Sequence, residues 1–146
     1  MRALILLSVL TLLQAGCSTS TEPDPQGSPA LRAEDAAGVV FGAERSEYRR
    51  GETAKIVLRN ETDATIGYNL CTSSRELRSG GGWKRYAPLR VCTAAFYNLA
   101  PGAESVLDEP ITEEWQPGEY RMVTTINMPA RNAHGEVFTP SFTVKP

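Results

Sequence analysis

Short apolar runs separated by turn-forming residues make up the chain from about Asp35 onward, and they show no persistent helical period. In the run TAKIVLRN, Ala54, Ile56 and Leu58 alternate with polar or outward-facing residues, as a half-buried strand requires. Runs with this two-residue period predict strands rather than helices. The chain is therefore expected to be all-β.

Further runs of this kind are separated by NETDAT, by three glycines in a predicted hairpin, and by two Pro-Gly turns. Pro140 lies inside the last run and predicts an edge position or a bulge, because proline cannot donate to a ladder. Seven or eight short strands at roughly regular spacing favour a β-sandwich. The predicted strands lie within 39–42, 53–60, 65–71, 75–86 (the hairpin), 90–99, 103–110, 119–128 and 136–144.

The first sixteen residues read as a signal peptide. Arg2 gives a positive start, an apolar run follows, and small residues end the segment. The apolar run is too short to cross a hydrocarbon core of about 30 Å comfortably, and no second run of about 20 apolar residues follows. The sequence therefore predicts a mature chain without a transmembrane helix.

The segment around Cys17 resembles a bacterial lipobox. Ala15, Gly16 and Cys17 fit that motif, whereas Gln14 stands where an aliphatic residue is commoner. The resemblance implies that Cys17 receives a diacylglyceryl group and becomes the first residue of a lipid-anchored protein. Ser18 follows the cysteine in place of an aspartate, which implies outer-membrane sorting if the source has two membranes.

Residues 17–34 are expected to form the acylated cysteine and a flexible tether. Most of this segment is Ser, Thr, Pro, Gly and acidic residues, so it has little apolar surface to offset its ordering entropy. The domain organisation that follows is a leader at 1–16, a tether at 17–34 and one folded domain at 35–146.

The order of motifs in the folded part resembles the bacterial immunoglobulin-like domains found in exported proteins. The motifs are YRRGETAKIVLRNET, IGYNLC, GGWKRY around Trp83, PGEYRMV and a final F-x-V strand. The resemblance implies an immunoglobulin-like sandwich from about Val39 to Val144. Pro117, Gly118 and Tyr120 resemble the tyrosine corner of such domains, in which the hydroxyl donates to nearby backbone.

Cys71 and Cys92 are expected to form a disulfide, because the predicted exported compartment allows disulfides to persist. On the chain-entropy model, a loop of this length stabilises the fold by roughly 3 kcal/mol. Alternation places Cys71 on the opposite face from Leu70, so the bridge is expected at an edge or an outer face. A catalytic thiol is the competing interpretation, and it requires a nearby base.

The charged residues argue against nucleic acid and against catalysis. There are 15 Lys and Arg against 17 Asp and Glu, without a block of like charge, so no basic stripe is available for phosphates. His134 is the one histidine, and no G-x-S-x-G elbow is present. An acidic cluster before Trp115 lacks EF-hand spacing and is interpreted as a solvated loop; its members are Asp108, Glu109, Glu113 and Glu114. No metal, cofactor or catalytic residue is predicted.

Several aromatic residues allow a sugar-stacking surface as well as the core and cross-strand roles usual in small sandwiches; they are Trp83, Tyr86, Trp115 and Tyr120. The function expected from these features is a non-enzymatic binding or assembly module. Its expected partners are a protein or a glycan, and the lipid attaches it to a membrane. The alternative is a proteinase inhibitor, because the order of strand, N-E-T turn, Gly-Trp hairpin and P-G-x-Y is also similar to the bacterial intracellular proteinase inhibitor domain.

Overall fold

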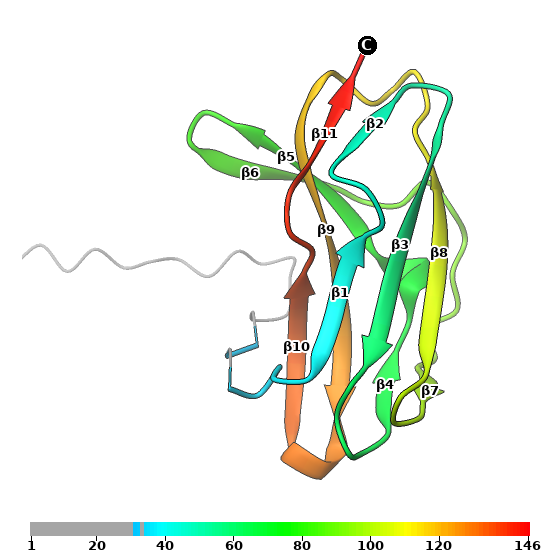
Figure 1. Cartoon of the computed structure of the whole chain (residues 1–146), viewed down its shortest axis with the longest axis vertical. Coiled ribbons are helices and arrows are strands. Elements are labelled where there is room, and N and C mark those ends of the chain that lie inside the picture. Colours follow the sequence, from blue (N-terminus) through cyan, green and yellow to red (C-terminus); the bar gives the residue numbers. More distant parts are fainter. Residues whose placement is uncertain (1–30, 33) are drawn as a thin grey trace, which may run out of the picture.

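The computed structural model describes residues 31–32 and 34–146, and in them two sheets of mostly antiparallel strands face each other (Figure 1). The smaller sheet has three strands in the order β1-β3-β8, which places β8 at one edge and β1 at the other. These strands are β1 (Val39–Ala43), β3 (Thr53–Asn60) and β8 (Glu104–Pro110).

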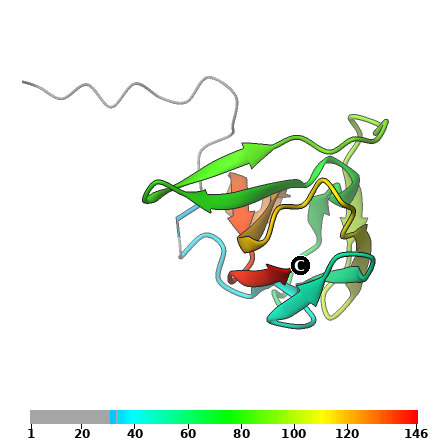
Figure 2. The same cartoon turned by 90° about the horizontal axis from the view of Figure 1, so that it is seen from above.

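The larger sheet is built around β9, whose two edges each carry two partners. β5 and β4 pair with one edge of β9, and β11 and β10 pair with the other. Only the β2–β11 pair is parallel. The strands of this sheet are β2 (Glu47–Arg49), β4 (Ile66–Tyr68), β5 (Ser74–Ser79), β6 (Gly82–Tyr86), β7 (Tyr97–Leu99), β9 (Gly118–Met128), β10 (Ala133–Phe138) and β11 (Phe142–Lys145). Figure 2 shows the β5–β6 hairpin extending beyond the sandwich.

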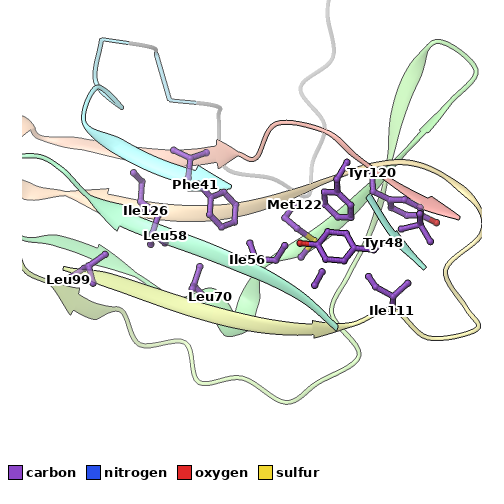
Figure 3. Packing of buried hydrophobic residues seen from close by; sticks show 14 of the residues in the cluster. Phe41, Tyr48, Ile56, Leu58, Leu70, Leu99, Ile111, Tyr120, Met122 and Ile126 are labelled. Atoms are coloured by element: carbon purple, nitrogen blue, oxygen red, sulfur yellow. The ribbon is translucent and has the colours of Figure 1, made fainter. Parts of the chain in front are cut away.

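The core lies between the sheets and follows the two-residue period of the sequence (Figure 3). Ala54, Ile56 and Leu58 are fully buried on the inner face of β3, as predicted. Tyr120 and Met122 face them from β9 (Figure 3). A fully buried side chain of this size stabilises the fold by roughly 1.5–3 kcal/mol, so these two inner faces hold the sheets together.

The predicted immunoglobulin-like sandwich is confirmed, but the described residues contain eleven strands rather than seven or eight. The predicted strand over 90–99 is wrong for most of its length, since only Tyr97–Leu99 forms β7. The backbone before β7 bonds to one side chain instead of a neighbouring strand: the Asn69 amide donates to the carbonyls of Thr93 and Ala95, at 2.7 and 2.9 Å.

Two other predicted strands are shorter or divided. The run 65–71 is a strand only at Ile66–Tyr68, because the 3-10 helix η1 (Leu70–Thr72) follows, capped by the Asn69 side chain. The last run is divided into β10 and β11 by a break at 139–141 that contains Pro140, where an edge position or a bulge was expected. Thr139 spans the break, since Met122 N donates to its Oγ1 and its own N donates to Met122 O, both at 2.9 Å.

The predicted leader, Cys17 and most of the tether lie outside the described residues. The folded domain begins before residue 35, because Leu31 is half-buried against the core and its N–H donates to the Glu136 carbonyl at 3.0 Å. Arg131, the last residue of the second 3-10 helix η2 (Pro129–Arg131), donates to the carbonyls of Asp35 and Ala37. In the described ranges, no helix is long and apolar enough to cross a bilayer.

Candidate binding groove

The groove lies along β8, at the side where the two sheets are open. β8 pairs with β3 on one side only, and no strand of the described residues pairs with its other side. The segment 87–96, between β6 and β7, runs past this edge (Figure 2). Its residues Leu89 and Arg90 form the wall of the groove that faces β8. The groove is therefore made by two parts of the chain with different local structure.

The disulfide between Cys71 and Cys92 holds this segment in place. The two Cα atoms are 5.7 Å apart, so the predicted pairing is confirmed. Both cysteines are half-buried, and the bridge joins η1 to the segment 87–96 rather than crossing the core. A covalent link of this kind keeps an irregular segment from moving away from the sandwich edge.

Arg90 crosses the groove and connects its walls. Its Nη1 donates to Glu109 Oε2 at 2.5 Å, and its Nε donates to the Cys71 carbonyl at 2.7 Å. A longer contact joins Nη2 to the Ser73 carbonyl at 3.3 Å. Glu109 is 8% exposed, so its carboxylate depends on this partner. One guanidinium thus ties the edge strand of the smaller sheet to η1 of the larger one.

A pocket of about 630 Å³ lies on one side of Arg90. Trp115 forms part of its lining and is 1% exposed, so the ring belongs to the core as well. The Arg75 guanidinium stacks 4.8 Å from the centroid of that ring. Leu107 adds an apolar wall, while Glu113 and Glu114 stand at the exposed rim.

A second pocket of about 300 Å³ lies on the other side of Arg90. Tyr97 and Val106 line it and are both exposed apolar residues. Leu107 borders both pockets. Together the two pockets form one groove that follows β8 and that Arg90 divides.

The outer wall of the groove presents large apolar side chains to solvent. Leu89 is 79% exposed and Val91 is fully exposed, although both lie beside the disulfide-linked Cys92. Scattered apolar residues are normal on a surface, but a contiguous group beside a pocket is typical of an interaction site. This arrangement can bind a ligand that has both apolar and charged groups.

A separate ionic cluster lies on the outer face of the larger sheet. Arg85 donates to both carboxylate oxygens of Glu136, at 2.7 and 2.9 Å, and to Glu76 Oε1. These bonds, those to Glu136 foremost, raise the pKa of the Arg85 guanidinium against the opposing effect of burial. Arg121 donates to Glu76 Oε2 at 2.6 Å. The carboxylates are satisfied within the cluster, which makes it a clamp between β5, β6, β9 and β10.

The sequence-predicted aromatic residues are placed differently from one another. Tyr120 is buried, and its hydroxyl donates to the Gln116 carbonyl at 2.9 Å, the bond expected of a tyrosine corner. Pro117 and Gly118 carry the chain from that carbonyl into β9. Trp83 is half-buried on the hairpin, where the Arg121 guanidinium lies 4.4 Å from its ring centroid. The tryptophan of the core is Trp115 instead.

The remaining predicted candidates are dispersed. His134 is exposed on β10 and meets Phe96 edge to face. In the part of the chain that the structure describes, no group of three or more His, Cys, Asp or Glu side chains is arranged to hold a metal ion. The acidic cluster instead borders the groove, with Glu109 paired to Arg90. Sequence reasoning did not identify Arg75 and Arg90, because neither belongs to a recognisable motif.

Fold and groove together define the class: an immunoglobulin-like β-sandwich with a disulfide-bordered groove at one edge. No family model and no curated protein matches the sequence. Among solved structures, the chain is similar to the alkylpurine DNA glycosylase AlkC of Pseudomonas fluorescens bound to DNA containing an abasic site analog, with a TM-score of 0.38 and 11% identity over 75% of this chain and 31% of that one. It is also similar to PapD-like domain 7 of human CEP192, with a TM-score of 0.34 and 11% identity over 97% and 96% of the two chains.

The chain thus spans about a third of the length of the glycosylase chain and nearly all of the human domain. Similarities at this level do not extend to function. The fold class of this chain follows from its own two sheets and their pairing.

Proposed function

We propose that this chain is an exported, lipid-anchored binding module of the bacterial cell envelope and that it acts without catalysis. The leader at 1–16 and the lipobox resemblance around Cys17 support export and anchoring. With two membranes in the source, the domain would stand on the outer membrane and face the periplasm or the exterior. Its partner would be a protein or a glycan.

The observation that carries the proposal is the groove with its exposed apolar wall. Leu89 and Val91 extend into solvent from a segment that a disulfide ties to η1. A covalently restrained wall loses little conformational freedom when a partner binds, and preorganisation of this kind favours affinity. The pocket beside it is lined by Arg, Asp, Glu, Leu, Pro, Thr and Trp residues, a mixture suited to recognition.

Anchoring is tested by metabolic labelling with a fatty acid. The full chain should incorporate the label, and Cys17→Ser should lose it. Cys71→Ser is the matched control and should keep the label, because Cys71 belongs to the disulfide. If Cys17→Ser keeps the label, acylation at Cys17 is refuted.

Binding through the groove is tested with a photoreactive residue at position 89 of the anchored protein in cells. A photoreactive residue at Val40, which is exposed on β1 at the opposite edge of the smaller sheet, is the control. We expect a discrete cross-linked species from position 89 and none from position 40. A cross-linked proteinase would favour the inhibitor alternative, and equal labelling at both positions would refute the groove as the binding site.

A further inference from the structure

The free edge of β8 has unused backbone hydrogen-bonding groups. Asn60 N donates to Ala103 O at one end of the β3–β8 register, and Ile111 N donates to Glu52 O at the other. In an antiparallel pair, every second residue exchanges hydrogen bonds with its neighbour. Ala103 and Ile111 bond at the two ends of this register, so the odd-numbered residues of β8 between them bond to β3 as well. Val106 and Asp108 are even-numbered, so their N–H and C=O groups point away from β3, toward the free edge.

The side chains of β8 alternate in the same way. Ser105, Leu107 and Glu109 face inward toward the groove, whereas Val106 and Asp108 are exposed. A strand added beside β8 would continue the smaller sheet and place every second side chain over the groove. Side chains on one face of a strand are roughly 7 Å apart. The two pockets on either side of Arg90 offer separate places for them.

The charge of the groove defines what such a strand must carry. Two arginines and four carboxylates line the larger pocket, which gives a net charge of −2. Arg90 is paired with buried Glu109, Arg50 lies 3.4 Å from Glu113 and Arg75 lies 4.0 Å from Glu114. Among the described residues, exposed Asp108 is the rim acid without an arginine or lysine partner. Exposed Val106 and Leu89 supply the apolar contacts beside it. Basic residues alternating with apolar ones complement this pattern.

The same charges disfavour a second copy of β8 as the occupant. In antiparallel self-pairing through the outward-pointing backbone groups, a register centred on Val106 would place Glu104 opposite Asp108. Like charges directly across a sheet are destabilising. The occupant must therefore differ from β8 in charge.

We propose that β8 is a docking edge that binds an extended segment of a partner protein, in which apolar and basic residues alternate. Backbone bonds to Val106 and Asp108 hold the segment, and the groove selects its side chains. The inference rests on the proposed function and specifies the binding surface and the chemistry of the partner.

The probe is an acetylated and amidated seven-residue peptide of alternating valine and lysine, matched in length to β8. Titration calorimetry and amide chemical shifts are recorded on the oxidised full chain. We expect binding that shifts the amides of Val106 and Asp108. The valine-glutamate peptide should bind at least about tenfold more weakly, because it repeats the charge of the rim. Binding that leaves both amides unshifted, or that is equal for the two peptides, overturns the proposal.

Backbone pairing is tested by N-methylating alternate amides of the lysine peptide. Two versions are made, one methylated on each set of alternate amides. The version whose β8-facing amides are blocked should lose at least about tenfold in affinity, since each lost hydrogen bond contributes roughly 1 kcal/mol. The other version should retain most of its affinity. Equal loss or equal retention in both versions would contradict strand addition.

The charge argument is tested with Asp108→Lys. This variant should weaken the lysine peptide by at least about threefold and strengthen the glutamate peptide. Glu44→Lys is the matched control, because Glu44 is exposed beside β1, across β3 from the groove, and should leave both affinities unchanged. Equal effects of the two variants would show a net-charge effect and would overturn the proposal.

Failure of this inference is distinguishable from failure of the proposed function. If position 89 cross-links but the lysine peptide does not bind, the proposed binding function is supported and the proposal that β8 is a docking edge is refuted. No cross-link at position 89 together with no peptide binding would remove both.

Discussion

Replacing Arg90 by alanine should destabilise the domain by far more than removing a surface arginine. Arg90 supplies the cation for Glu109, whose side chain is 10% exposed, and it also donates to the Cys71 carbonyl. Breaking a buried ion pair costs about 3–5 kcal/mol. The Arg90 side chain is 27% exposed, so water replaces part of what is lost, and we expect about 2–4 kcal/mol for Arg90→Ala.

The assay is equilibrium unfolding in urea at neutral pH with the disulfide intact. Arg59→Ala is the matched control, because Arg59 and Glu104 form an exposed pair with Nη2 3.3 Å from Oε2 on neighbouring strands. Pairs of that kind contribute about 0–1 kcal/mol. The prediction requires a clear difference between the two variants in the free energy of unfolding.

A double-mutant cycle with Glu109→Gln separates the ion pair from the other contacts of Arg90. Once Glu109 is neutral, Arg90→Ala should cost at least about 1 kcal/mol less than it does in the parent. The reasoning is refuted if Arg90→Ala costs no more than Arg59→Ala, or if its cost is the same with and without the Glu109 charge.

Three further predictions concern the rest of the fold. Reducing the Cys71–Cys92 bridge, or replacing both cysteines by serine, should lower the free energy of unfolding by roughly 3 kcal/mol on the chain-entropy model and free the wall of the groove, as amide exchange would show. Asn60→Ala should cost about 2–4 kcal/mol in urea unfolding, because Asn60 is 0% exposed and its amide donates to two backbone carbonyls that would lose their donor. Tyr120→Phe should cost about 1 kcal/mol through loss of the hydroxyl bond. Burial raises the pKa of Tyr120, so the stability difference between parent and Tyr120→Phe should be complete below about pH 10 and diminish above it, as unfolding measured against pH would reveal.

The strands that sequence predicted well are those whose side chains alternate between core and solvent. In β3, Ala54, Ile56 and Leu58 repeat every second residue, and the sheet buries each of them. The prediction failed over 90–96, where apolar residues are present but the backbone bonds to the Asn69 amide. A side chain more than twenty positions away decides the conformation there, and no local pattern records it.

The groove was only partly predictable for a similar reason. Glu109 was recognised as a member of an acidic cluster, but its burial and its partner were not. Arg90 reaches it from a different part of the chain, after the disulfide has brought the segment 87–96 to the sandwich edge. The composition of a site assembled across loops is set by topology rather than by spacing in the sequence.

The position of β9 at the centre of the larger sheet has a consequence for the order of folding. β9 lies late in the chain, yet β4 and β5 before it and β10 and β11 after it all depend on it for pairing. A chain that emerges from its N-terminus first can form the β1–β3 pair and the β5–β6 hairpin, but not this sheet. Pairings so distant in sequence close slowly. The larger sheet, and with it most of the core, therefore forms only when nearly the whole chain is present.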